Sequence, residues 1–132
     1  MDTEHTTAPP ASRLEQVRTG DVVVLRPIGR LDDALADDIR ERALEAHAPV
    51  VIDLDGCLQI AASAIDRIAS AWTLYRPEMC IACSEPGDRR MLEVRQPGGA
   101  LAVFASVEQA IAARDGLPGG WKTADSTVPS PA

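Results

Sequence analysis

A short and almost wholly apolar run, Val50-Val51-Ile52-Asp53-Leu54, lies between two segments of helical periodicity, and it constrains the fold most. A run this short and this rich in β-branched residues is typical of a strand buried inside a sheet. Strands that alternate with helices are joined by right-handed crossovers and build a sheet that is at least partly parallel. The run therefore predicts an α/β domain with residues 50–54 inside its sheet.

Two amphipathic helices flank this strand. Asp32 and Asp33 are good caps for a helix from about residue 34 to 47, which Pro49 ends. Its apolar residues fall on one stripe at 3.6 residues per turn: Leu35, Ala36, Ile39, Ala43 and Ala46. The second helix, residues 61–75, has apolar residues at spacings of three and four: Ala61, Ile65, Ile68, Trp72 and Tyr75.

The rest of the chain continues the alternation. Residues 13–17 and 22–25 flank a glycine-containing turn and predict a hairpin, and Pro27 marks the end or an edge of its second strand. Further along, strands are expected at 79–83 and 101–104, and helices at 87–94 and 106–113. The order β-β-α-β-α-β-α-β-α predicts a mixed sheet of about five strands with about four helices.

The length of 132 residues favours a single domain. Residues 1–11 and the tail from 115 to 132 are rich in Pro, Gly, Ser and Thr, so we expect both to be disordered around a domain at 12–114.

Charge and composition exclude several classes of function. The formal net charge of -7 and the absence of a basic run argue against nucleic acid as a partner. No segment is apolar enough to insert in a membrane, and the polar N-terminus MDTEHTTAPP does not resemble a secretory signal, so we expect a cytoplasmic protein. The 3 Cys provide no disulfide framework.

Four segments, in order, resemble the STAS domain, the family of bacterial anti-sigma factor antagonists. Gly29-Arg30-Leu31-Asp32 matches its G-x-L-D motif before the first helix, and residues 50–54 match its central strand. Residues 90–94 are similar to its third helix, and residues 104–110 resemble its F-x-S-x-E-x-A pattern. The resemblance covers about residues 12–114 and implies a SpoIIAA-like fold.

The chain departs from the family at its working motif. There a partner kinase phosphorylates the first Ser of D-S-S-G at the start of the second helix, whereas this chain has Ala61-Ala62-Ser63-Ala64. Ala62, at the acceptor position, has no hydroxyl, so the usual switch is expected to be absent. A phosphate there acts by adding negative charge to a docking surface, and Ala62 leaves that surface permanently uncharged.

Several residues allow both a structural and a functional interpretation. Ser63 is either a capping residue or a substitute phosphoacceptor, and Asp32 either caps the first helix or contributes to partner binding. Cys80 and Cys83 have a C-x-x-C spacing, but residues three apart on a strand point to opposite faces, which favours buried thiols over a metal or redox site.

The resemblance implies a non-enzymatic binding module in sigma factor control by partner switching. It would dock on an anti-sigma factor or related serine kinase, with no metal or cofactor; self-association stays open. The expected binding residues are Asp32, Gly56, Ala61, Ala62, Ser63 and Ala64, in the loop 56–64 and the helix that follows. The alternative is an accessory subunit of an ABC lipid-transport complex, a role in which STAS-like domains need no phosphoacceptor.

Overall fold

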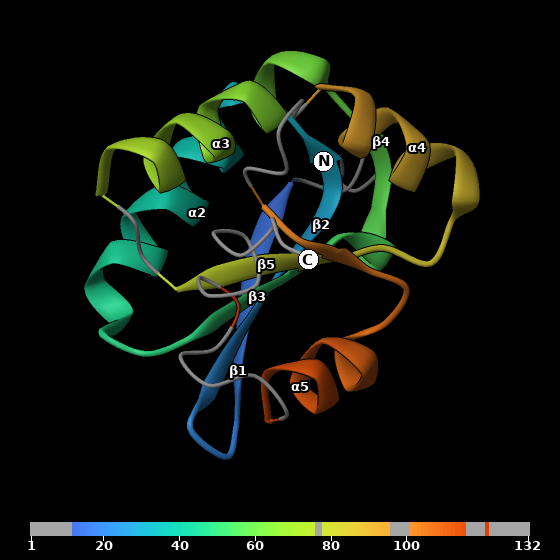
Figure 1. Ribbon diagram of the computed structural model, residues 1–132. Coiled ribbons are helices and arrows are strands. Elements are labelled where there is room, and N and C mark those ends of the chain that lie inside the picture. The colour runs from blue at the N-terminus through green and yellow to red at the C-terminus, as the bar shows by residue number, and fades with distance from the viewer. Residues whose placement is uncertain (1–11, 76–77, 96–100, 116–120, 122–132) are drawn as a thin grey trace, which may run out of the picture.

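The computed structural model describes residues 12–75, 78–95, 101–115 and 121. Within them, six strands form one sheet in the order β1-β2-β3-β5-β6, with β4 paired to β2 (Figure 1). The strands are β1 (Arg13–Thr19), β2 (Val22–Leu31), β3 (Val50–Asp53), β4 (Cys57–Ile60), β5 (Met79–Ala82) and β6 (Val103–Phe104). The β1–β2 pair is antiparallel and the other pairs are parallel, which confirms the expected mixed α/β sheet.

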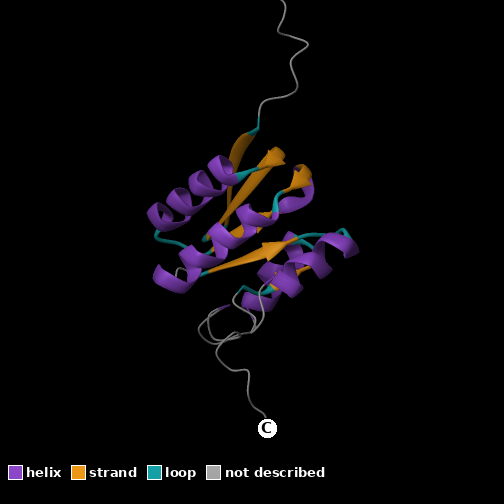
Figure 2. Ribbon diagram, turned by 90° about the horizontal axis from the view of Figure 1, so that it is seen from above, coloured by secondary structure: helices purple, strands orange, loops and turns teal. Residues whose placement is uncertain are grey.

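The described helices cover the two faces of this sheet unequally. They are α2 (Asp33–Ala46), α3 (Ala62–Tyr75), α4 (Pro86–Arg95) and α5 (Val107–Asp115), and a 3-10 turn, η1 (Leu54–Gly56), follows β3. α2 and α3 lie side by side on one face, while α5 lies on the other (Figures 1 and 2). All four helices begin and end within one or two residues of the expected positions. None of these described helices combines the length and apolar character needed to cross a membrane.

The central strands β2, β3 and β5 supply side chains to two separate cores. Alternate residues such as Leu25, Ile52 and Ile81 join the larger cluster, together with Ile39 of α2 and Ile65 of α3. The residues between them belong to a smaller cluster beneath α5: Val22, Val24, Val51, Cys80, Ala82, Ala110 and Trp121. This division follows from the two-residue period of a strand and explains why residues 50–53 are buried throughout. The side chains of Trp72 and Tyr75 lie outside the described part of the chain.

Strand β2 is longer than expected. Of the two possibilities for Pro27, the end of the strand or an edge, the first was wrong, because β2 continues through Pro27 to Leu31. Pro27 lies between the part of β2 that pairs with β3, which ends at Leu25, and the part that pairs with β4, which begins at Gly29. Its missing N–H therefore interrupts neither parallel ladder. Gly29 marks a register shift and has a φ of 96°, a left-handed conformation that suits glycine.

The expected loop at 56–64 contains a strand that the sequence did not predict. After β3, the η1 turn leads into β4, which runs parallel to the end of β2 with Gly29 opposite Cys57 and Leu31 opposite Ile60. The Ala61 N–H then donates to the Leu31 carbonyl at 2.9 Å. The start of α3 is thus fixed to the sheet by backbone pairing, and the described strands number six where about five were expected.

The packed region extends beyond the expected boundary at residue 114. Asp115 belongs to α5, and Trp121, placed by composition in a disordered tail, is only 1% exposed. Its indole Nε1 donates to the Ala110 carbonyl at 2.9 Å, and its ring lies 5.9 Å from the Arg114 guanidinium. Arg114 in turn pairs with Glu78 at 2.8 Å. The rest of the two segments expected to be disordered lies outside the described residues.

Candidate functional site

The corner where β4 leads into α3 contains five of the six expected binding residues. Ala62 and Ser63 are exposed, while Gly56 and Ala61 are half-buried. Ala64 has 0% exposure and belongs to the larger core, so its side chain cannot touch a partner. The surface of this corner is therefore smaller than the stretch 56–64 that the sequence suggested.

Gly56 has a packing role at this corner. A Cβ added there would lie 2.6 Å from Ile28 Cδ1 and 3.2 Å from the Pro27 carbonyl oxygen. Both approaches are closer than ordinary van der Waals contact, so a side chain at position 56 would have to displace the end of Ile28 and press on the Pro27 carbonyl. The glycine therefore allows the η1 turn to pack closely against β2.

Asp32 caps α2, which confirms the structural interpretation of this residue. Its Oδ1 accepts a hydrogen bond from the Leu35 N–H at 2.9 Å, the geometry of an N-cap. The preceding residue, Leu31, bonds to Ala61, so Asp32 and the start of α3 lie on neighbouring segments of chain. Asp32 is half-buried and thus presents part of its surface beside the corner.

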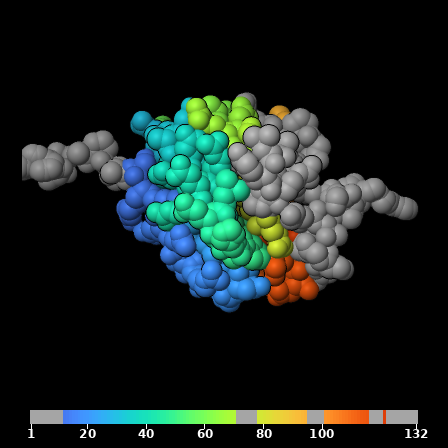
Figure 3. Space-filling model, turned by 90° about the vertical axis from the view of Figure 1, so that its left-hand side faces the viewer, coloured from blue at the N-terminus to red at the C-terminus, as the bar shows by residue number. Residues whose placement is uncertain are grey.

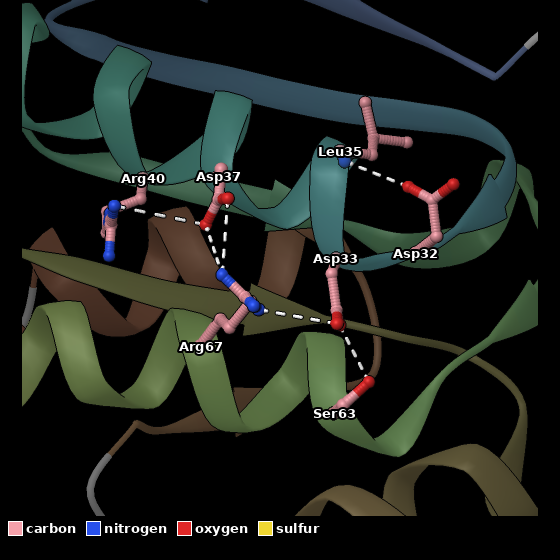
Figure 4. A network of polar contacts seen from close by, with 7 residues as sticks. All are labelled: Asp32, Asp33, Leu35, Asp37, Arg40, Ser63 and Arg67. Atoms are coloured by element: carbon pink, nitrogen blue, oxygen red, sulfur yellow. Dashed lines mark hydrogen bonds and ion pairs between the residues drawn. The ribbon is translucent and has the colours of Figure 1, made fainter.

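Ser63 takes part in a polar network between α2 and α3 (Figure 4). Its hydroxyl donates to Asp33 Oδ1 at 2.7 Å, and Arg67 Nε lies 3.5 Å from the other oxygen of Asp33. The Arg67 guanidinium also contacts Asp37 at 3.1 Å, and Arg40 lies 3.9 Å from the same carboxylate. The Ser63 hydroxyl is thus held by a carboxylate that also contacts Arg67.

Sequence reasoning missed Leu58, the most exposed large apolar side chain among the described residues. It is 80% exposed on β4, four residues before Ala62. Its neighbours are firmly held, because Gln59 accepts a hydrogen bond from Arg30 at 3.1 Å and the Cys57 thiol donates to the Pro27 carbonyl at 3.5 Å. No periodic signal marks this short strand, so the sequence alone could not place Leu58 on a rigid surface.

Cys80 and Cys83 are buried on opposite faces of the sheet. Cys80 belongs to the smaller core and Cys83 to the larger one, as expected for residues three apart on a strand. Burial raises the pKa of the Cys57 thiol to about 12 and also raises that of Cys83, so both are protonated at neutral pH. Within the described residues, no three His, Cys, Asp or Glu side chains converge as a metal site would require.

The solved structures that this chain resembles include anti-sigma factor antagonists. One such protein from Mycobacterium paratuberculosis is 16% identical, with a TM-score of 0.66 over 80% of this chain and 96% of that one. Unphosphorylated SpoIIAA is 18% identical, with a TM-score of 0.55 over 81% of this chain and 100% of that one. The chain has the STAS-domain fold. An anti-sigma factor antagonist domain protein from Planctomyces limnophilus has the same fold, at 17% identity and a TM-score of 0.56 over 76% and 95% of the two chains.

The likeness to STAS domains is one of fold, because no family model and no curated protein matches the sequence itself. It confirms the SpoIIAA-like architecture expected from four short sequence segments. The described part of the chain spans the STAS fold from β1 to α5, and the β4–α3 corner lies beside α2 within it (Figure 1).

Proposed function

We propose that the protein is a cytoplasmic, non-enzymatic binding module that docks on an anti-sigma factor or related serine kinase through the β4–α3 corner. The observation that carries this proposal is the exposure of Leu58, at 80%, on the same rigid corner as the exposed Ala62. Because β4 is paired to β2, the backbone that carries Leu58 is already ordered, and a partner that covers this side chain removes apolar surface from water.

The corner also supports binding without a phosphorylation switch. SpoIIAA is a protein with a phosphorylated form, whereas Ala62 here has no hydroxyl to accept phosphate. Ser63 is the only hydroxyl side chain from residue 56 to 66, and its Oγ is bonded to Asp33. A partner would therefore meet an uncharged surface at Leu58 and Ala62 whatever the activity of its kinase domain.

Catalysis is not required by this arrangement. The thiols of Cys57 and Cys83 have raised pKa values because they are buried, and a protonated thiol is a poor nucleophile. Binding accounts for the exposed features of the corner, and the polar contacts beneath it serve to join α2 to α3.

Calorimetric titration of the candidate kinase with the chain and two variants tests the proposal. We expect Leu58→Asp to weaken binding by at least about tenfold, as for an interface anchor. The matched control is Val94→Asp on α4, because Val94 is 72% exposed and should change affinity by less than about twofold. Equal effects of the two variants would overturn the role of the corner.

Two further readouts separate the proposal from its alternatives. Incubation with kinase and ATP, followed by intact-mass measurement, should leave the chain unmodified; stoichiometric phosphate on Ser63 would contradict a missing switch. Affinity purification should recover a kinase of this class. Recovery of a transporter ATPase without such a kinase would instead establish the accessory-subunit role, for which an acceptor at position 62 is also unnecessary.

A further inference from the structure

A hollow on the opposite face of the sheet has no part in the proposed docking. Its volume is about 280 Å³, and it lies between the β1–β2 hairpin, the end of β3 and the first turns of α5. A hollow of this size suits a small molecule and not a peptide. α2 and α3 cover the other face, so the hollow and the β4–α3 corner are separate surfaces (Figure 1).

One wall of the hollow is apolar. It is formed by Val17 of β1, Val24 of β2, and Val107 and Ile111 of α5. Val17 is 49% exposed and is one of three large apolar side chains left exposed among the described residues. A ligand with a short hydrocarbon body would remove this wall from water, which is favourable.

The remaining wall has an excess of negative charge. Arg26 Nε pairs with Asp53 Oδ2 at 3.0 Å, and Asp53, only 6% exposed, also accepts the Asp55 N–H at 3.0 Å. Arg26 is therefore committed to one carboxylate, while Asp55 and Glu108 also line the hollow. Asp55 accepts hydrogen bonds from the uncharged N–H and hydroxyl of Ser84, at 2.8 and 3.0 Å. One cation against three carboxylates leaves a formal charge of -2 in the lining.

We propose that this hollow binds a small organic cation, an ammonium group attached to a short alkyl chain. The ammonium would lie toward Asp55 and Glu108 at the polar side, with the alkyl chain against Val17 and Ile111. An organic cation fits better than a metal ion, because no three ligating side chains converge anywhere in the described residues. The lining also includes the hydroxyls of Thr19 and Ser106 and the N-terminal turn of α5, whose partial positive charge of about half a unit offsets only part of the formal charge of -2. The net negative charge and the apolar side chains therefore favour a cation with an alkyl chain over neutral and anionic molecules of the same size.

NMR titration of the full chain with n-butylammonium, butyrate and 1-butanol tests this proposal. We expect butylammonium to shift the amide signals of β1, β3 and the start of α5 in a saturable manner, and the two other probes to leave them unchanged. Butyrate or butanol binding as tightly as butylammonium would overturn the choice of a cation, and no saturable shift with butylammonium would overturn the site.

Matched variants separate a specific site from general attraction to an acidic chain. Glu108→Gln should weaken butylammonium binding about two- to fivefold, as expected for one exposed charge pair. Glu45→Gln removes the same charge from an exposed position on α2 and should have no effect. Val17→Thr, which keeps the shape of the side chain, should weaken binding as well. An equal loss in the Glu108 and Glu45 variants would show non-specific attraction and reject the proposal.

Discussion

The hydroxyl of Ser63 and the carboxylate of Asp33 are joined by a 2.7 Å hydrogen bond that links the first turns of α3 and α2. This bond occupies the one hydroxyl that stands beside the position where STAS domains are expected to accept phosphate. Together with Arg67, which contacts both Asp33 and Asp37, it joins two helices that are otherwise held by apolar packing.

Replacing Ser63 by Ala should lower the free energy of unfolding by about 0.5–1.5 kcal/mol, because a hydrogen bond to a charged acceptor is lost. Urea denaturation measures this change. Ser70→Ala is the matched control: Ser70 is exposed on the same helix, so that variant corrects for the helix propensity of Ala. Equal stabilities of the two variants would show that the contact with Asp33 contributes nothing.

Gly56→Ala should destabilise the fold by about 1–3 kcal/mol, since the new Cβ meets Ile28 Cδ1 and the Pro27 carbonyl. The added variant Ile28→Val removes the Cδ1 atom and should relieve part of the strain. In a double-mutant cycle measured by chemical denaturation, we therefore expect the double variant to lose less stability than the two single variants lose in total. Strictly additive losses would rule out the close approach of Gly56 to Ile28.

Trp121→Ala should lower the free energy of unfolding by about 3–5 kcal/mol, as for other large buried aromatic residues. Trp121→Phe should cost less, because it keeps most of the apolar contact and loses the hydrogen bond to Ala110. Thermal unfolding of both variants, with the exposed Val94→Ala as control, checks this order. A Trp121→Ala variant as stable as the control would mean that α5 needs no cover from this residue.

Burial raises the pKa of the Cys57 thiol to about 12 from its ordinary value of 9.0. Between these values the unfolded chain releases the proton while the folded chain keeps it. The contribution to stability is therefore complete below pH 9 and decreases as the pH rises toward 12, by at most about 1.4 kcal/mol per pH unit. Cys57→Ala should show a shallower loss of stability in this range, measured by denaturation at fixed ionic strength. Parallel pH profiles would contradict the raised pKa.

Periodicity was sufficient to predict α2 and α3, because their apolar residues repeat at the spacing of one buried face. A short apolar run predicted β3, which is buried on both faces, and the capping box formed by Ser106 and Gln109 predicted α5. It failed for β4, where two of four residues are exposed and the strand forms only because β2 continues past Pro27 to pair with it. Neither the length of β2 nor its bulge at Gly29 is encoded in the segment 57–60 itself.

The polar network between α2 and α3 and the packing of Trp121 could not be predicted from the sequence, because both depend on contacts between distant parts of the chain. Asp33 and Ser63 are 30 residues apart, and their contact depends on how two helices lie against each other. Trp121 stands in a stretch whose Gly and Pro content predicts disorder, yet its side chain packs with α5 in the smaller core. The single Trp in an otherwise polar tail was the one feature of the sequence that could have indicated packing there.

The unequal cover of the two sheet faces has a consequence for how the molecule opens. Three helices pack over the larger core, whereas α5 and Trp121 alone enclose the smaller one within the described residues. Amide protons of α5 should therefore exchange with deuterium well before those of β3, which is buried on both sides. Slow exchange would persist at the centre of the sheet after the second face has become accessible to solvent, so that unfolding proceeds from one side of the molecule.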